Sequence, residues 1–187
     1  MILVLLADGF EEIEALTPVD MLVRAGLDVK TVGITSKIAV GSHGISVVCD
    51  LLPDEVSLDK ISGVIFPGGM PGALNLDASP FTDKAIEAVM KNGGVLAAIC
   101  AAPLVLGRRG VLKGKKATCY PGFENELIGA SVQDASVVTD GNIVTARGMG
   151  VSLAFAKELI RLYKGADEAE RLGEAVMEQI PPITVNE

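Results

Sequence analysis

The sequence contains no tryptophan, one histidine and two tyrosines, and aromatic residues make up only 4% of its 187 positions. Hydrophobic residues nevertheless reach 49%, so a core must be filled by Val, Ile, Leu and Ala. Because His43 is the sole histidine, a metal site with several histidine ligands is excluded. The sequence has no Cys-x-x-Cys pair, and no metal or organic cofactor is expected.

Basic residues are also scarce, with 16 Lys and Arg against 24 Asp and Glu, which gives a net charge of −8. Without a basic stripe, neither nucleic acid nor an anionic membrane is expected as a partner. The cysteines Cys49, Cys100 and Cys119 are odd in number and lack framework spacing, which argues against a secreted disulfide scaffold. The opening apolar run, 1–6, is too short for a membrane span and lacks the basic start of a signal peptide. These observations predict a reduced, cytoplasmic protein.

Strands, glycine-containing turns and helices alternate along the chain, as in α/β proteins. Apolar runs predict strands over 1–6, 28–34, 63–66 and 94–99, and shorter ones over 37–40, 45–49, 115–118, 136–139 and 143–145. Apolar periodicity predicts helices over 11–24, 81–91, 101–108, 121–128, 151–163 and 167–178, with an extended tail over 181–187. This order predicts a single domain over 1–187, a doubly wound α/β sandwich with a mostly parallel central sheet.

Active sites of such sheets lie at the carboxyl ends of the strands, near the point where the strand order reverses. Three stretches of this sequence follow predicted strands in that way: the loop after Leu6, the loop 67–72 and the turn at Cys100. The candidate chemistry is expected in these three places.

Cys100 lies in the stretch AAICAAP (97–103), where a buried strand runs into a helix through small residues. Small neighbours allow a strained turn that points one side chain into a pocket, which is the geometry of a nucleophile elbow. The positive end of the following helix is expected to stabilise a thiolate and lower the thiol pKa. The alternative is a core cysteine, since free cysteine is among the most buried residue types.

Gly68 and Gly69 end a neighbouring buried strand, where paired glycines let a backbone N–H approach a ligand closely. Together with the amide of Ala101, such an N–H could form an oxyanion hole, although paired glycines are also common in ordinary turns.

Glu11, Glu12 and Glu14 open the first predicted helix, where acidic residues complement the helix dipole. Three acids in four positions are more than a helix start needs, so one carboxyl is expected to face inward. A carboxyl beside the thiol would have a raised pKa and could share a proton with it.

Four stretches resemble the ThiJ/PfpI superfamily in their order and spacing: ADGFEEIEALTPVDMLVRAG, VIFPGG, LAAICAAP and ARGMGVSLAFAKELI. The most similar branch is the parkinsonism-associated one with its bacterial relatives, and the resemblance spans essentially the whole chain. It implies a flavodoxin-like three-layer sandwich with a nucleophile elbow, and usually a homodimer. It also implies that Cys100 is the reactive, oxidation-sensitive cysteine, that Glu14 hydrogen-bonds its sulfur, and that Gly69 and Ala101 supply backbone N–H groups.

The resemblance further places Arg24 and the hairpin around His43 near the dimer interface and the mouth of the pocket. One position departs from the family pattern: many relatives carry a histidine before a proline after the strand that follows the elbow, whereas this sequence has Tyr120 before Pro121. Tyr120 could donate a hydrogen bond, but its ordinary pKa of about 10 makes it a poor base at neutral pH. A Cys-His-acid triad is therefore in doubt. By itself, His43 is expected to be a surface turn residue.

The resemblance implies a cysteine-dependent enzyme acting on small reactive carbonyls, as a glutathione-independent glyoxalase or a protein deglycase. Its substrate would be a small carbonyl compound or a glycated protein. A first alternative is a redox sensor or stress-protective, chaperone-like protein in which Cys100 is oxidised without turnover. A second is a cysteine peptidase or amidase, which the missing histidine disfavours. Cys49 and Cys119 are expected to be structural.

Overall fold

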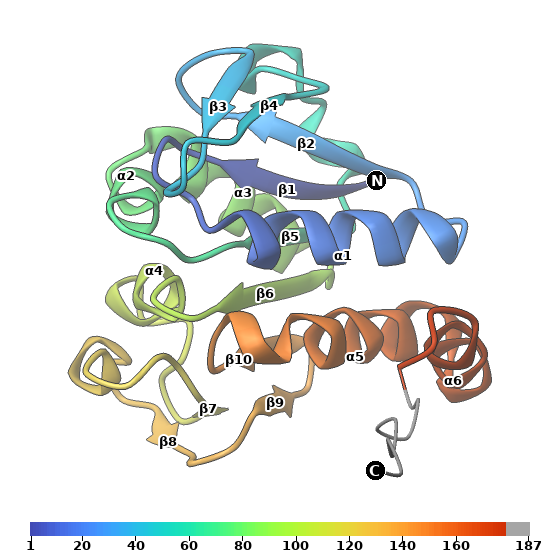
Figure 1. Cartoon of the computed structure of the whole chain (residues 1–187). Coiled ribbons are helices and arrows are strands. Elements are labelled where there is room, and N and C mark those ends of the chain that lie inside the picture. Colours follow the sequence, from blue (N-terminus) through green and yellow to red (C-terminus); the bar gives the residue numbers. More distant parts are fainter. Residues whose placement is uncertain (179–187) are drawn as a thin grey trace, which may run out of the picture.

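A computed structural model of the chain describes residues 1–178 and arranges them around one six-stranded sheet (Figure 1). The spatial order of its strands is β2 (Val29–Gly33), β1 (Ile2–Leu6), β5 (Gly63–Phe66), β6 (Val95–Ile99), β10 (Ile143–Ala146) and β9 (Val137–Asp140). The first five strands are parallel, and β9 pairs antiparallel with β10. The chain passes from β1 outward to β2 and returns to β5 on the other side of β1. The order therefore reverses between β1 and β5, where the carboxyl ends of parallel strands form a binding crevice.

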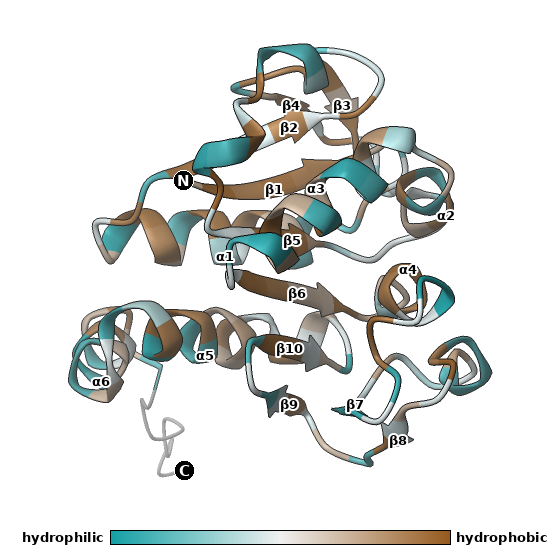
Figure 2. Ribbon diagram, turned by 180° about the vertical axis from the view of Figure 1, so that it is seen from behind, coloured by the Kyte–Doolittle hydropathy of each residue, from teal (hydrophilic) through white to brown (hydrophobic). Residues whose placement is uncertain are grey.

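Helices cover both faces of this sheet, as the two opposite views in Figure 1 and Figure 2 show. One face carries α1 (Glu12–Arg24), α5 (Ser152–Lys164) and α6 (Ala166–Ala175), and the other carries α2 (Gly72–Asp77), α3 (Pro80–Lys91) and α4 (Pro103–Arg108). The strand β1 has side chains buried on both faces, with Leu3 and Leu5 on the α3 side and Val4 and Leu6 on the α1 side. Such a strand needs an uninterrupted apolar run. The predicted three-layer α/β sandwich with a mostly parallel sheet is confirmed.

A separate hairpin stands beside the carboxyl end of β1. It consists of β3 (Ile38–Val40) and β4 (Ser46–Val48), which pair antiparallel as the sequence predicts. Its backbone is tied to the loop that follows β1, because Gly9 N donates to Val40 O at 2.8 Å and Ser42 N donates to Phe10 O at 2.8 Å. This loop leads directly into α1, so the hairpin and the first turn of α1 are held together.

Some predicted boundaries are wrong. The helix predicted over 121–128 is reduced to one 3-10 turn, Glu124–Glu126, because Gly122 has a φ of 96°, which a right-handed helix cannot contain. The helix after Cys100 begins at Pro103 rather than at 101. Helix α2 was not predicted, since it has six residues and follows a glycine-rich turn.

Two short strands, β7 (Lys116–Ala117) and β8 (Ser131–Val132), form a parallel pair outside the main sheet. Three further 3-10 turns complete the secondary structure of residues 1–178: Pro53–Glu55, Leu58–Lys60 and Met149–Val151. The tail predicted over 181–187 lies outside the described residues. Within the described part of the chain, none of the helices combines the length and the hydropathy needed to cross a membrane.

Candidate active site

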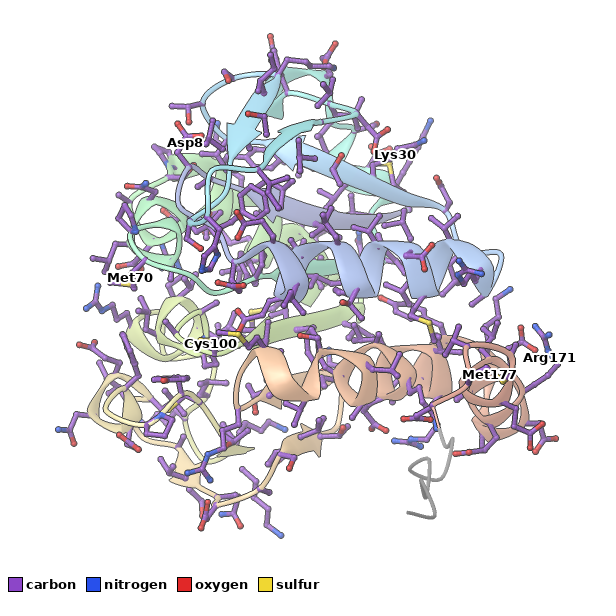
Figure 3. All side chains as sticks on the ribbon, viewed as in Figure 1. Asp8, Lys30, Met70, Cys100, Arg171 and Met177 are labelled. Carbon is purple, nitrogen blue, oxygen red and sulfur yellow. The ribbon has the colours of Figure 1, made fainter. Side chains whose placement is uncertain are left out.

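Cys100 follows the last residue of β6 in a left-handed conformation, with a φ of 64°. A non-glycine residue rarely adopts this conformation, which costs about 1–2 kcal/mol. Hydrogen bonds hold the backbone there on both sides: Cys100 N donates to Ala146 O at 2.9 Å, and Tyr120 N donates to Cys100 O at 2.7 Å. The thiol is partly exposed rather than buried. This geometry is that of a nucleophile elbow, and Figure 3 shows Cys100 beyond the end of β6, between α4 and α5.

Glu14 lies in the first turn of α1 and is fully buried. Its Oε2 accepts a hydrogen bond from Gly68 N at 2.9 Å. Among residues 1–178 its Oε1 is buried without a hydrogen-bond partner, and the Cys100 thiol lies beside this carboxyl. A buried oxygen without a donor favours the protonated carboxyl, which can then act as a donor itself.

Gly68 is the point where these two side chains meet. A Cβ atom at this position would lie 2.5 Å from Glu14 Oε2 and 2.6 Å from Cys100 Cβ. Any residue larger than glycine would therefore push the carboxyl and the thiol apart. Gly68 contributes its backbone N–H and the absence of a side chain, not a group that reaches substrate.

Glu14 and Cys100 form a coupled acid pair. Burial is the largest effect on Glu14 and, with the negative charge of Glu11, it outweighs the hydrogen bonds and raises the pKa of Glu14 to about 7. Burial and then the Glu14 carboxylate raise the pKa of the Cys100 thiol to about 12. The contribution of Glu14 to the thiol pKa vanishes when Glu14 is protonated. The two groups therefore lose their protons as a pair, with a first ionisation near neutral pH.

The backbone N–H groups of Gly69 and Ala101 lie beside the Cys100 sulfur and act to lower the pKa of its thiol. The sequence led to the expectation that the helix dipole would lower the thiol pKa. That expectation is wrong, because α4 has only six residues and burial dominates. The stabilisation of a thiolate comes instead from these two N–H groups, the same pair that was predicted to form an oxyanion hole. Whether they bind a substrate oxygen stays a prediction.

Tyr120 lies at the other side of the elbow, with 47% of its surface exposed. Its ring packs over the backbone of Gly148, where an added Cβ would lie 3.3 Å from Tyr120 Cδ2. It lines an open cavity of about 430 Å³ together with Pro121 and the segment 147–151. Its backbone N–H is bonded to Cys100 O, and its side chain lines that cavity.

His43 belongs to the hairpin turn and contacts α1. Its Nδ1 lies 2.9 Å from Glu12 Oε2, and its backbone N–H donates to Glu12 Oε1 at 2.8 Å. The hydrogen bond to Glu12, followed by the negative charge of Glu11, raises the pKa of His43. Burial opposes ionisation of Glu12, but the hydrogen bonds from His43 and from backbone N–H groups, that of Ile45 among them, lower its pKa to about 2. His43 therefore fastens the hairpin to the helix that carries Glu14.

Glu11, Glu12 and His43 are the one group in the described part of the chain whose ligand atoms lie close enough for a metal ion, within 4.8 Å of one another. These atoms are already used. Ser42 Oγ lies 3.2 Å from Glu11 Oε2 and 3.3 Å from Glu12 Oε2, and both Glu12 oxygens accept from His43. Their arrangement is that of a hydrogen-bonded latch between hairpin and helix.

Arg24 does not meet the other predicted site residues within one chain. It ends α1, ten residues after Glu14, which corresponds to about 15 Å along a helix. Its guanidinium donates to Asp20 on the same helix at 2.8 Å. Within the single chain Arg24 lies away from the pocket, because α1 runs away from the carboxyl edge of the sheet, and the role of Arg24 at the pocket mouth stays a prediction. Its position at a dimer interface stays a prediction.

Arg147 is a charged residue near the elbow that the sequence analysis did not single out. It directly follows Ala146, whose carbonyl accepts from Cys100 N, and it lines both the cavity beside Tyr120 and a second cavity of about 280 Å³ beside Cys119. A signal was present: Arg147 follows a predicted strand at its carboxyl end.

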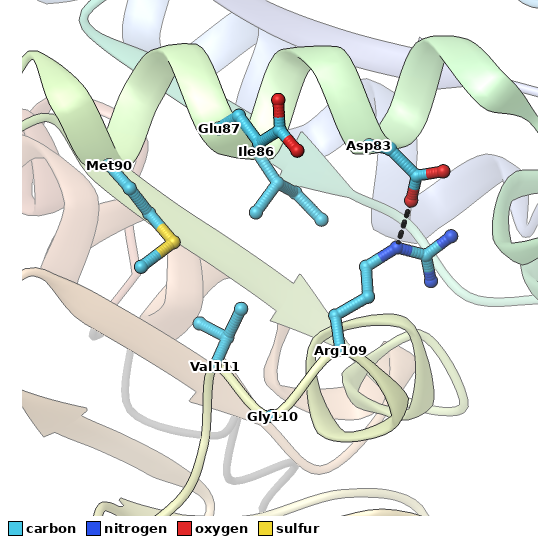
Figure 4. A pocket seen from close by; sticks show the side chains of 7 residues that line it. All are labelled: Asp83, Ile86, Glu87, Met90, Arg109, Gly110 and Val111. Carbon is cyan, nitrogen blue, oxygen red and sulfur yellow. Dashed lines mark hydrogen bonds and ion pairs between the residues drawn. The ribbon is translucent and has the colours of Figure 1, made fainter.

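Another cavity, of about 330 Å³, lies away from this site, between α3 and the end of α4 (Figure 4). Its floor is apolar, with Ile86, Met90 and Val111. Its one guanidinium, that of Arg109, is held by Asp77 and by Asp83, with Nε 2.6 Å from Asp83 Oδ1. The arginine there ties two helices together and carries no evident chemistry.

The resemblance stated from the sequence motifs can be compared with known proteins. Residues 1–162 match the sequence profile of the DJ-1/PfpI family. The chain belongs to this family. Among DJ-1/PfpI relatives, protein dj-1beta of Drosophila melanogaster is 34% identical over 178 residues, which cover 94% of this chain and 95% of that protein. Deglycase PfpI of Pyrococcus furiosus is 37% identical over 169 residues, which cover 87% of this chain and 99% of that protein.

Solved structures of DJ-1 proteins share the fold. The crystal structure of Drosophila melanogaster DJ-1beta gives a TM-score of 0.89 at 33% identity and covers 94% of this chain and 96% of that one. The structure titled Toxoplasma gondii DJ-1, oxidized, gives 0.90 at 31% identity and covers 94% of this chain and 97% of that one. Both the family and the three-layer fold of this DJ-1/PfpI member are therefore established.

Proposed function

We propose that this protein is a cysteine-dependent enzyme that acts on small reactive carbonyls, of the glyoxalase or deglycase type. The observation that carries the proposal is the pair of Cys100, strained on its elbow, and Glu14, a buried carboxyl whose pKa is raised to about 7. A group that titrates near the working pH can both accept and return a proton. The names of the Pyrococcus relatives, which are called deglycases, support the same class.

The proposed reaction begins when the Cys100 sulfur adds to the aldehyde carbon of a 2-oxoaldehyde such as methylglyoxal. A carbon–sulfur bond forms, the carbon–oxygen π bond breaks, and the proton lost by the thiol is taken up by the aldehyde oxygen to give a hemithioacetal. The N–H groups of Gly69 and Ala101, which lie against the sulfur, are placed to stabilise the negative oxygen.

Glu14 then removes the proton from the carbon bonded to sulfur and returns a proton to the neighbouring carbon. The former aldehyde carbon is thereby oxidised to a thioester, and the neighbouring ketone carbon is reduced to an alcohol. Water hydrolyses the thioester and releases a 2-hydroxy acid and the free thiol of Cys100. The balance is one molecule of water added, with no external oxidant or reductant. With a glycated amine in its hemiaminal form, the sulfur replaces the amine at the same carbon: the carbon–nitrogen bond breaks, the thiol proton leaves with the amine, and the same hemithioacetal forms.

The test is formation of lactate from methylglyoxal by the purified protein. Cys100→Ala and Glu14→Gln are each expected to abolish it, whereas Cys49→Ala, which removes a thiol in the hairpin region, keeps the wild-type rate. Full activity of the Cys100→Ala variant would contradict the assignment of the nucleophile. Loss in Cys100→Ala with normal turnover in Glu14→Gln would remove Glu14 from the proton transfer.

Redox sensing without turnover is the second candidate function, and the backbone N–H groups beside the Cys100 sulfur favour it. If Cys100 is oxidised to a sulfinic acid, the N–H groups of Gly69 and Ala101 and a protonated Glu14 can donate to its oxygens. Mild peroxide should then add about 32 Da, the mass of two oxygen atoms, at Cys100 alone. Equal oxidation of Cys49 and Cys119 would contradict this function, since both are buried.

We also propose that the protein acts as a homodimer. Exposed apolar side chains gather on two elements joined by the His43–Glu12 contact: Ile13 and Leu16 on α1, and Ile45 and Val48 on the hairpin. Exposed apolar side chains on neighbouring elements favour association with another protein surface. A dimer through this face would bring a partner close to the first turn of α1, and so to the pocket.

A further inference from the structure

We propose that the cavity between Tyr120 and the segment 147–151 is a substrate subsite, and that Arg147 binds a carboxylate there. The inference rests on the proposed function. It assigns the specificity of the site: the preferred carbonyl compound carries an apolar body that ends in a carboxylate.

The position of the cavity follows from the hydrogen bonds of the elbow. Tyr120 N donates to Cys100 O, and Cys100 N donates to Ala146 O, the residue before Arg147. Both walls of the cavity are therefore joined directly to the backbone of Cys100. Cys100 does not line the cavity itself, and the proposed ligand reaches from the sulfur into the space between these two neighbouring walls.

The size of the cavity, about 430 Å³, exceeds what a small aldehyde needs. A water molecule occupies about 30 Å³ in the liquid, so a compound as small as methylglyoxal leaves most of the volume to solvent. Tyr120, Pro121 and Met149 give the cavity apolar walls, and the Tyr120 ring offers a face for an aromatic or aliphatic body.

Arg147 is the cation of this cavity. Its Nη1 pairs with Asp134, whose side chain is 89% exposed, while the Arg147 side chain is 44% exposed. Ion pairs this exposed contribute little, because water screens them, so a ligand carboxylate can replace Asp134 at small cost. A guanidinium binds a planar carboxylate through two parallel N–H groups.

Arg109 provides the contrast within the same molecule. Its guanidinium donates to both Asp77 and Asp83 and to the backbone oxygens of Asp77 and Val105. Those groups leave it no free edge for a ligand. Arg147 has a single carboxylate partner in the part of the chain that the structure describes.

The test uses two alkylating probes of the same shape, 4-(iodoacetamido)benzoate and its neutral carboxamide, 4-(iodoacetamido)benzamide. The Cys100 sulfur attacks the same carbon in both probes and displaces iodide. The ratio of the two alkylation rates therefore reports the carboxylate contact and is independent of the thiol pKa and of catalytic turnover. Each rate is followed by intact mass with the modified residue located by peptide mapping.

Arg147→Met is expected to lower the ratio, benzoate over benzamide, by roughly tenfold, the effect of one partly exposed charge-assisted hydrogen bond. Asp134→Asn is expected to raise it about twofold, because the competing carboxylate is gone. Arg171→Met removes the same charge from α6, where Arg171 pairs with Glu168 far from Cys100 (Figure 3), and should leave the ratio unchanged.

An unchanged ratio in Arg147→Met overturns the proposal, and so does a wild-type protein in which neither probe reaches Cys100. If Arg147→Met does not fold, the rate ratio of Asp134→Asn decides. A higher ratio than in the wild type supports the proposal, and an unchanged ratio overturns it. An Arg147-dependent ratio in a protein that forms no lactate would keep the subsite and refute the glyoxalase activity. Lactate formation with an Arg147-independent ratio would refute the subsite and keep the glyoxalase activity.

Discussion

At the scale of single residues, the site depends on one carboxyl group held where water cannot reach it. Glu14 has no exposed surface, and its Oε1 has no hydrogen-bond partner among the residues that the structure describes. Such a group prefers its neutral form, because ionisation without solvation is unfavourable. Glu14 therefore lowers the stability of the fold whenever it is charged, and the protein keeps it for a reason other than stability.

The first prediction concerns Glu14→Gln and the free energy of unfolding. The pKa of Glu14 is about 7 in the folded chain, against 4.5 ordinarily, so the folded state holds this proton more tightly than the unfolded state. Stability should fall by roughly 3 kcal/mol as the pH rises from about 4.5 through 7, a slope that the glutamine variant lacks. Urea denaturation of both proteins at about pH 5 and about pH 8 measures the difference. Parallel curves for the two proteins would contradict it.

The second prediction concerns Gly69, which has a φ of 87°. A Cβ there would collide with the backbone of Glu11 and Gly9, so Gly69→Ala must shift the loop that supplies an N–H to the Cys100 sulfur. Alkylation of Cys100 by iodoacetamide should slow by about tenfold or more, the order of one lost hydrogen bond to a charged group.

The matched control for that substitution is Gly93→Ala. Gly93 has a similar φ of 66°, but an added Cβ meets nothing within 4 Å. It should cost about 1 kcal/mol of stability through backbone strain and leave the thiol reactivity intact. Equal loss of reactivity in both variants would show that strain, not the position of the Gly69 amide, is responsible.

The predicted strand ends placed Cys100 and the acidic start of the first helix at one edge of the sheet, and the family resemblance selected Glu14 among its three acids. The sequence could not give the pKa values of Cys100 and Glu14. Burial of Glu14 arises from packing among β1, β5 and β6, which no local pattern specifies. Arg147 was missed although it also follows a predicted strand, since a lone arginine in a turn has no chemical pattern around it.

At the scale of elements, the hairpin β3–β4 is joined to α1 by ionisable groups rather than by apolar packing alone. Glu12 accepts from the backbone and the ring of His43, and Gly41 leaves the space that the Glu12 side chain occupies. A raised His43 pKa stabilises this contact below pH of about 6.5, and the stabilisation is lost as the pH rises through the folded-state value.

The third prediction is a direct titration of that contact. As the sole histidine, His43 gives a single imidazole signal by NMR, and its pKa should lie above 6.5. Glu12→Gln should return it toward 6.5, because the main hydrogen-bond partner loses its charge. Glu55→Gln alters an acid paired with Lys37 at the start of the hairpin. This substitution should leave the pKa of His43 unchanged. An unshifted His43 in the Glu12 variant would mean that the contact is absent in solution.

The larger elements of the fold could be predicted because their apolar runs and helical periodicities extend over many residues. The buried runs that became β1, β5 and β6 and the periodic stretch that became α1 were correct within a residue or two. The shorter helix predicted over 101–108 begins two residues late, and that predicted over 121–128 is absent apart from one 3-10 turn. A glycine at 122 with a positive φ, or a proline at 103 that begins α4, outweighs the helical pattern around it.

At the scale of the whole molecule, the exposed apolar side chains of α1 and the hairpin favour association with a second copy of the chain. The fourth prediction is that Ile13→Asp and Val48→Asp each convert a dimer into a monomer, because each buries a charge in the proposed interface. Met90→Asp, an equally exposed apolar position on α3, is the control and should keep the dimer. Light scattering coupled to size exclusion gives the masses, and a wild-type monomer would contradict the homodimer.

The hydrogen bond from Cys100 to Ala146 has a consequence for biosynthesis. Ala146 follows Cys100 by 46 residues, so β10 pairs with β6 only after a long further stretch of chain has been made. A nascent or prematurely terminated chain thus carries an ordinary cysteine, free to turn and without its elbow. The elbow is therefore complete only after β10 has paired with β6, which makes the site one of the last parts of the sheet to form.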